Sequence, residues 1–136
     1  MVKTKKIVIG VVCVLALDYV IAQLYSNPKI TIKKHLPFNY NAQTIPPFGI
    51  RIQEEDKGNE ILRKHELVHW GQYRKTGAII FHLKYGLQKM IYGYDKMPME
   101  IEARTKSGEK QECITDYTNC VRDGRANTIN DVNFRV

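Results

Sequence analysis

The sequence predicts an α+β fold, in which a short sheet packs on one central helix, two further helices follow, and an apolar segment precedes them all. Alternation of apolar and polar residues before residue 54 predicts the strands, and helical periodicity from residue 59 predicts the helices. The chain has 136 residues, of which 43% are hydrophobic and 26% charged. That size and composition suit one folded domain, which we expect over residues 26–108, between a leader (1–25) and a polar C-terminal tail (109–136).

The leader begins with three lysines and continues with the apolar run Ile7–Leu17. One interpretation is a transmembrane helix over residues 7–25, whose length is near the minimum that spans the hydrocarbon core of a bilayer. The alternative is a signal peptide that is cleaved after the small residues Val20 and Ala22. Asp18 is costly inside a membrane span, but the length favours an uncleaved signal-anchor.

Both interpretations predict the same location for the body of the protein. The lysines stay in the cytoplasm by the positive-inside rule, so the body is expected outside the cytoplasm, anchored to the membrane or exported. The formal net charge is +7. Because the basic residues are spread along the chain rather than gathered in one patch, we expect a membrane as a partner and no nucleic acid.

The region before residue 59 predicts strands and turns. Four prolines between residues 28 and 47 exclude a long helix there. Lys29–Lys33 and Phe48–Gln53 alternate apolar and polar residues, as strands with one buried face do. The polar stretch from Glu54 to Asn59 predicts a loop.

Three helices are predicted after that loop. Asn59 is a suitable N-cap for the first, and Gly77 suits its C-terminal end. A proline in the first turn favours the start of the third. The predicted helices cover Asn59–Lys75, Ala78–Tyr92 and Pro98–Lys106.

The tail after Gly108 has weak periodicity, so we expect it to pack loosely. Cys113 and Cys120 lie seven residues apart within it. In an oxidising compartment the two would close a small disulfide loop, and otherwise they are unrelated free thiols. Spacing alone does not decide between these two states.

The string His65-Glu-Leu-Val-His69 lies inside the first predicted helix. Residues four apart share one face of a helix, so the two imidazoles are placed to hold one zinc ion. Glu66 beside them is placed to accept a proton from a water molecule. The alternative is two histidines with ordinary hydrogen bonds. It is disfavoured because they share a sector of the helix with Ile61, Leu62 and Val68, and buried histidines need partners.

A catalytic zinc ion usually has three protein ligands, so a third ligand is needed. The strongest candidate is Glu100, at the start of the third predicted helix, because two helices bring the chain back towards the histidines. Glu102 competes with it from another side of that helix. The remaining histidines are His35 and His82, and we interpret His82 as a non-ligand.

The chain resembles the gluzincin branch of metallopeptidases in three short sequence motifs. The resemblance is greatest to very small bacterial and phage proteins with an HExxH motif, many of which are associated with membranes. It covers roughly residues 48–104. The three motifs are His65-Glu-Leu-Val-His69-Trp-Gly-Gln72, Gly93-Tyr94 and Pro98-Met-Glu-Ile-Glu-Ala-Arg104.

The resemblance implies a minimal zincin-like, metal-binding domain over residues 26–108. Its zinc ligands are expected to be His65, His69 and Glu100, with Glu66 as the general base. Zincins also place the edge strand that binds an extended peptide before the active helix, which implies that role for the strand at Phe48–Gln53.

Weaker candidates surround these residues. Tyr94 or Tyr92 is placed to stabilise an oxyanion through its hydroxyl group, and the alternative is an aromatic side chain packed at a turn. Gln72 lies one turn past His69 and is interpreted as an exposed residue, with support of the site as the alternative.

Arg104 departs from the gluzincin pattern. An aspartate usually stands at this position and orients the first zinc histidine, so Asp95 or a backbone carbonyl would have to replace it. We expect a zinc-dependent metallopeptidase that acts on a peptide or protein substrate near a membrane. The departure motivates a second hypothesis, a catalytically inactive zinc-binding envelope or adaptor protein, and a third is a membrane adaptor without a metal.

Overall fold

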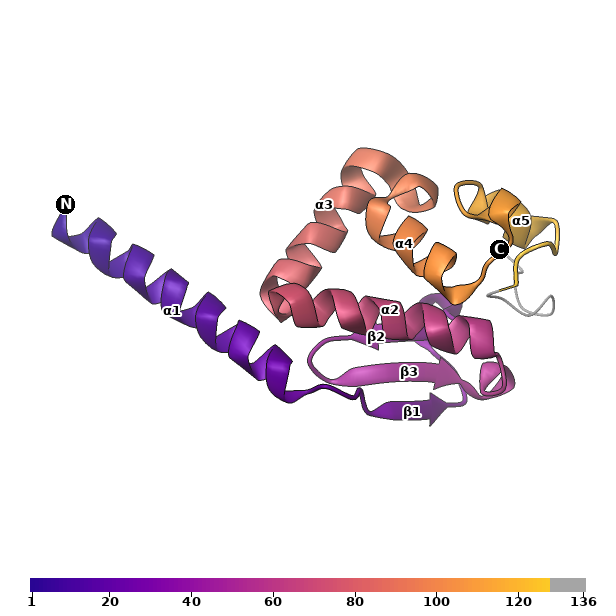
Figure 1. Cartoon of the computed structure of the whole chain (residues 1–136), viewed down its shortest axis with the longest axis horizontal. Helices are drawn as coiled ribbons and strands as arrows, with labels where there is room; N and C mark the ends of the chain where they lie inside the picture. Colours follow the sequence, from indigo (N-terminus) through magenta and orange to yellow (C-terminus); the bar gives the residue numbers. More distant parts are fainter. Residues whose placement is uncertain (128–136) are drawn as a thin grey trace.

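The computed structural model describes residues 1–127, and residues 128–136 of the predicted tail lie outside the described residues. The fold is α+β, as the sequence predicts, with a three-stranded sheet, helices stacked over it and a long apolar helix at the N-terminus (Figure 1). The α-helices are α1 (Val2–Leu24), α2 (Glu60–Thr76), α3 (Ala78–Lys96), α4 (Pro98–Ser107) and α5 (Tyr117–Arg122). The strands are β1 (Ile30–Lys33), β2 (Ala42–Ile45) and β3 (Gly49–Gln53), and short 3-10 helices lie at Pro37–Asn39, Glu54–Asp56 and Gln111–Cys113.

The sheet has the strand order β1-β3-β2, with β1 parallel and β2 antiparallel to β3. The predictions for β1 and β3 are confirmed, whereas β2 was not predicted. The strand at Phe48–Gln53 was expected to lie at the edge of the sheet, and this is wrong. It forms the central strand because β2 pairs along its second side, with Thr44 opposite Ile50.

The core lies between the sheet and the helices. Ile50 and Ile52 of β3 are buried and pack with Trp70 and Tyr73 of α2. Ala22 of α1 belongs to the same cluster and has no exposed surface. The last turns of α1 are therefore part of the folded body.

The predicted helices α2, α3 and α4 are confirmed. The Asn59 side chain accepts a hydrogen bond from the backbone N–H of Leu62 (3.0 Å), as an N-cap does. Gly77 ends α2 with φ of +86°, a conformation that glycine adopts without strain. Helix α3 runs to Lys96 and so extends beyond the predicted end, with an interruption at Gly93 (φ +72°).

Helix α1 is long and apolar enough to cross a membrane, a property that signal sequences share. Its C-terminal part is tied to the body by polar contacts. The Asp18 carboxylate accepts a hydrogen bond from the backbone N–H of Ile79 (2.8 Å) in the first turn of α3. The Gln23 amide donates to the carbonyl of Arg74 (2.5 Å). Asp18, which is costly in a membrane span, thus has a partner at a helix N-terminus, where negative charge is favourable.

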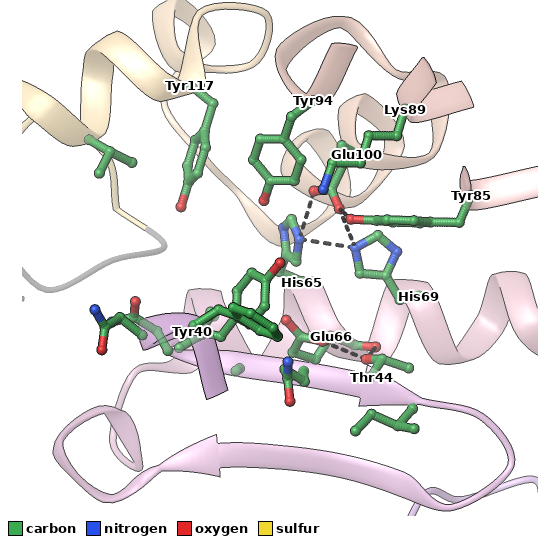
Figure 2. A pocket seen from close by; sticks show the side chains of 18 of the residues that line it. Tyr40, Thr44, His65, Glu66, His69, Tyr85, Lys89, Tyr94, Glu100 and Tyr117 are labelled. Carbon is green, nitrogen blue, oxygen red and sulfur yellow. Dashed lines mark hydrogen bonds and ion pairs between the residues drawn. The ribbon is translucent and has the colours of Figure 1, made fainter. Parts of the chain in front are cut away.

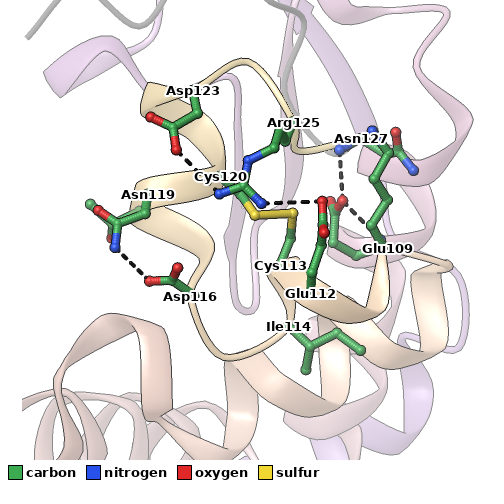
Figure 3. The surroundings of a disulfide bond; sticks show 12 residues. Glu109, Glu112, Cys113, Ile114, Asp116, Asn119, Cys120, Asp123, Arg125 and Asn127 are labelled. Atoms are coloured by element: carbon green, nitrogen blue, oxygen red, sulfur yellow. Dashed lines mark hydrogen bonds and ion pairs between the residues drawn. A yellow bond between two sulfur atoms is a disulfide. The ribbon is translucent and has the colours of Figure 1, made fainter.

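The part of the tail that the structure describes is packed rather than loose. A disulfide joins Cys113 to Cys120, which decides between the two states that the spacing allowed (Figure 3). Both cysteines are fully buried in a small cluster with Tyr117 and Val121. Weak periodicity hid this cluster, because a covalent link rather than a long amphipathic helix organises it.

Candidate metal centre

Three side chains from two helices meet at one point. His65 and His69 lie one turn apart on α2, and their Nε2 atoms are 3.1 Å apart. The two carboxylate oxygens of Glu100, from the first turn of α4, lie 3.2 Å from these Nε2 atoms, one on each. All three residues are buried. The potential ligand atoms lie within 4.8 Å of one another, so the three residues form a group that is arranged to hold a metal ion (Figure 2).

The chemistry of the three side chains fits zinc. Two imidazoles and one carboxylate are a donor set that catalytic zinc sites use. Among the described residues, Oε2 of Glu100 is buried without a hydrogen-bond partner, although it lies near His65. A cation would satisfy this oxygen. A second close group, Glu112 with Cys113 and Cys120, is not comparable, because both sulfurs are in the disulfide.

Gln72 supports His69, contrary to the expectation that it is exposed. Its side chain is buried, and its Oε1 lies 2.8 Å from Nδ1 of His69. An amide oxygen only accepts, so Nδ1 of His69 carries a proton and Nε2 faces Glu100. The Gln72 amide nitrogen donates to the carbonyl of Met99 (2.9 Å) and to the carboxylate of Glu102 (2.8 Å), which fixes the amide orientation.

Glu102 does not reach the histidines. Its carboxylate is one-third exposed and pairs with Lys106 and, more distantly, Lys75. The hydrogen bonds from Lys106 and Gln72 hold its pKa below the usual value. Of the two glutamates on α4, the structure brings Glu100 to the histidines and places Glu102 behind Gln72.

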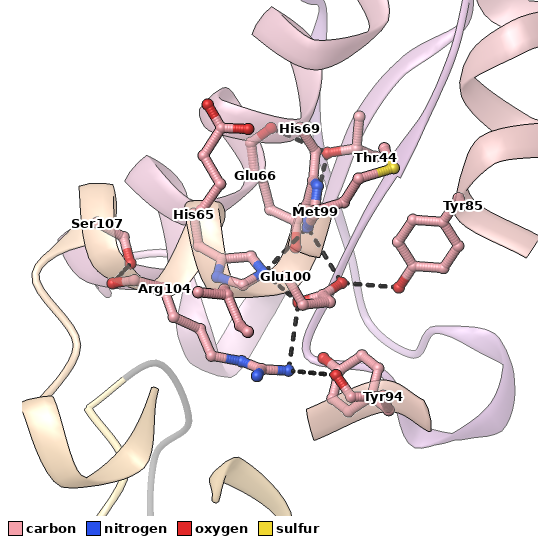
Figure 4. A network of polar contacts seen from close by, with 12 residues as sticks. Thr44, His65, Glu66, His69, Tyr85, Tyr94, Met99, Glu100, Arg104 and Ser107 are labelled. Atoms are coloured by element: carbon pink, nitrogen blue, oxygen red, sulfur yellow. Dashed lines mark hydrogen bonds and ion pairs between the residues drawn. The ribbon is translucent and has the colours of Figure 1, made fainter. Parts of the chain in front are cut away.

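Glu66 lies beside the cluster on the side of the sheet. The Thr44 hydroxyl of β2 donates to its carboxylate (2.5 Å). The same hydroxyl is 3.1 Å from the Glu66 backbone carbonyl. A strand that was not predicted from the sequence therefore orients the candidate general base (Figure 4).

The Glu100 carboxylate is held from its other side as well. The Tyr85 hydroxyl of α3 donates to its Oε1 (2.7 Å), and the Arg104 guanidinium lies 3.6 Å from its Oε2. Burial of Tyr85 beside this carboxylate raises the pKa of the phenol, so Tyr85 stays protonated and acts as a donor.

The charges within the cluster depend on one another. Burial alone would lower the pKa of His69, but the adjacent carboxylate of Glu100 outweighs it and raises this pKa to about 9. Burial would raise the pKa of Glu100, but the adjacent imidazoles of His65 and His69 keep it well below its usual range. Glu100 is thus an anion, and a metal ion that binds here displaces a proton from His69.

Arg104 is fully buried and does not orient a histidine. Its guanidinium carbon lies 4.8 Å from the ring centroid of Tyr94 and 4.5 Å from that of Tyr117. It donates to three backbone carbonyls, those of Tyr94, Asp95 and Ile114, at 2.8 to 3.1 Å. Arg104 therefore joins α4 to the end of α3 and to the tail.

No replacement for that aspartate is found among the described residues. Nδ1 of His65 is buried without a hydrogen-bond partner. The Asp95 carboxylate, the expected substitute, instead accepts hydrogen bonds from the backbone N–H (3.0 Å) and hydroxyl (2.6 Å) of Thr118. Support of the two histidines is thus unequal, because within residues 1–127 a partner at the second ring nitrogen is found for His69 and not for His65.

A cavity of about 460 Å³ opens in front of the cluster. It is lined by β2, by His65, Glu66 and His69 of α2, by the inner face of α3 and by α5. The hydroxyl of Tyr94 points into it (Figure 2). Tyr92 does not line the cavity and is 52% exposed. His82 also borders the cavity, but its Nε2 donates to the carbonyl of Pro46 (3.2 Å) rather than joining the cluster.

Comparison with known proteins adds no relative. No family model, no curated protein and no solved structure matches the chain.

Proposed function

We propose that the chain is a membrane-tethered zinc metallopeptidase with a minimal zincin-like fold, which hydrolyses peptide bonds in a peptide or protein substrate. The observation that supports this most is the buried convergence of His65, His69 and Glu100 at a cavity that also holds Glu66. Zinc bound by these three ligands supplies a Lewis acid that polarises the scissile carbonyl and lowers the pKa of a water molecule.

Glu66 is the residue proposed to accept and return the proton. Its carboxylate lies at the cavity, and the hydrogen bond from Thr44 fixes its orientation. A general base has to be held within hydrogen-bond reach of the proton that it takes. The contact with β2 provides that constraint from outside the helix that carries the metal ligands.

Tyr94 is proposed to stabilise the oxyanion. The residue is 37% exposed but its hydroxyl points into the cavity, and partial burial together with the nearby carboxylate of Glu100 raises its pKa above the ordinary value. The phenol is therefore protonated at neutral pH and is available as a hydrogen-bond donor.

The substrate is proposed to bind along β2. This strand lies at an edge of the sheet and lines the cavity from Ala42 to Ile45. An extended peptide can pair with such an edge through main-chain hydrogen bonds. It would then pass in front of Glu66 and the metal ligands.

Zinc content of the purified full-length protein tests the site. We expect one zinc ion per chain in the wild type and in Glu102→Ala, and none in His69→Ala or Glu100→Ala. Glu102 is the matched comparison, because it lies on the same helix and its carboxylate contacts Gln72 rather than the two histidines. A folded wild-type protein that binds no zinc contradicts the proposal.

A second candidate is a zinc-binding membrane adaptor without peptidase activity. Two observations favour it: the buried cation of Arg104 lies 3.6 Å from a ligand, and Nδ1 of His65 has no partner among the described residues. Glu66→Gln separates the two candidates. For a peptidase, cleavage of a peptide library falls at least about 100-fold with zinc content unchanged. An adaptor has no cleavage to lose, and its cellular function survives the substitution.

A further inference from the structure

Helix α3 is apolar on two opposite sides. Its inner side packs into the body through Ala78, Phe81 and Tyr85. Its outer side carries five residues that are 40% to 84% exposed and are spaced so that they share one face of the helix. We call this surface the α3 stripe, which consists of Ile79, Leu83, Leu87, Met90 and Ile91.

The α3 stripe starts where α1 joins the body. Asp18 accepts its hydrogen bond from the N–H of Ile79, the first residue of the stripe. In Figure 1, α3 borders the body on the side towards which α1 extends, and α3 runs across the direction of α1. A helix that crosses the direction of a membrane span lies along the membrane surface. The first residue of the α3 stripe therefore lies next to α1.

Two neighbouring features extend this surface. Phe48, in the turn between β2 and β3, is 75% exposed, and the hydrogen bond from His82 to Pro46 joins that turn to α3. Lys84 is exposed on α3 next to the stripe. An apolar helix face with aromatic and lysine neighbours is the composition that binds at the boundary of lipid headgroups and acyl chains.

We propose that the α3 stripe is embedded in the surface of the same membrane that α1 spans. Its occupant is lipid, at the level of the headgroups and upper acyl chains. The inner side of α3 lines the cavity with His82, Tyr85 and Lys89, so one wall of the cavity rests on the bilayer. The inference depends on insertion of α1 and is independent of the metal and of peptidase activity.

Fluorescence of single labels in the full-length chain tests this. The protein is reconstituted in phosphatidylcholine–phosphatidylglycerol vesicles, and an environment-sensitive fluorophore is attached to one cysteine. Leu87→Cys and Leu83→Cys report on the stripe, each in a Cys13→Ser background. Lys64→Cys is the matched control, because Lys64 is exposed near the N-terminal end of α2, away from the end that joins α3. The native Cys13, exposed on α1, reports insertion of that helix.

Lipids brominated in the upper acyl chain provide the readout. We expect blue-shifted emission and strong quenching at positions 83 and 87, quenching at Cys13, and aqueous emission without quenching at position 64. Aqueous, unquenched emission at both stripe positions with Cys13 quenched overturns the proposal. Blue-shifted emission that lipid does not quench and that depends on the protein-to-lipid ratio also overturns it, in favour of a second copy of the chain. If the label at Cys13 is not quenched, α1 is not inserted and the proposal for the α3 stripe is overturned. The proposed function is tested separately by the zinc content.

Discussion

Thr44 contributes one hydroxyl group to the candidate centre, and the effect of removing it is predictable. Thr44→Val keeps the shape of the side chain but loses the hydrogen bond to the Glu66 carboxylate. We expect kcat for peptide hydrolysis to fall about 10- to 100-fold, as for other partners of catalytic groups, with zinc content unchanged. Steady-state kinetics and zinc analysis measure the two effects. Thr105→Val is the control, because that hydroxyl bonds only within α4, and equal kcat in both variants would refute the role of Thr44.

Arg104 is a structural residue, and its loss is expected to destabilise the protein. Arg104→Met removes the donor to three backbone carbonyls, of which that of Ile114 is buried and those of Tyr94 and Asp95 are half-buried. A buried carbonyl left unpaired costs about 1–3 kcal/mol, so the free energy of unfolding should fall by about 2 kcal/mol or more. Urea unfolding of the detergent-solubilised chain measures this change. Arg122→Met, at an exposed arginine that pairs with Asp123, should stay within about 0.5 kcal/mol of the wild type.

The residues of the site differ in how well their roles could be predicted from the sequence. His65, Glu66 and His69 are related by helix geometry alone, so their spacing is sufficient. Gln72 was misjudged although a signal was present, because it lies three residues after His69 and seven after His65, on the same helix face. The contacts of Arg104 join segments that only the tertiary fold brings together, so no local pattern contains them.

Helix α3 takes its N-terminal cap from α1. Gly77 offers no side chain there, and Asp18 accepts the hydrogen bond from Ile79 instead. Asp18→Ala should lower the free energy of unfolding by about 0.5–2 kcal/mol, the usual cost of losing a cap. Asp18→Asn keeps an oxygen acceptor and should cost little. Denaturant unfolding of both variants checks this, and an equal loss in the two would show that charge rather than capping matters.

Elements with their own start and stop signals were predictable. Helix α2 begins after its N-cap Asn59 and α4 begins at Pro98, because these residues suit a helix start whatever the tertiary fold. Strand β2 has four residues without alternation, between turns rich in proline, and it exists through its pairing with β3. The edge of the sheet was therefore assigned to β3 instead of β2. Because β2 lines the cavity, the cavity could not be located from the sequence before the pairing of β2 with β3 was known.

Removal of zinc should affect the whole molecule, because the ligands come from two helices. Zinc that binds only the folded state stabilises it by about 2.7 kcal/mol at a hundredfold excess over Kd. We expect a chelator to lower the Tm of the full-length protein by roughly 10 °C and added zinc to restore it. Thermal unfolding followed by circular dichroism measures this. Glu100→Ala should have a low Tm that does not change when the chelator is added. If the Tm of the wild type does not change either, no ion is bound.

The rigid connection of α1 to the body determines how far the cavity lies from the membrane. Ala22 is buried in the core and Asp18 caps α3, so α1 passes into the body without a flexible linker. A protein joined to its membrane anchor by a flexible linker samples many distances from the membrane, but this body is fixed to the helix that precedes it. If α1 spans a bilayer, the cavity is held at one distance from the lipid surface. With the proposed peptidase activity, it would reach only those peptide bonds of a substrate that lie at one set distance from the lipid, so the distance of a bond from the membrane would add to the selectivity that its sequence provides.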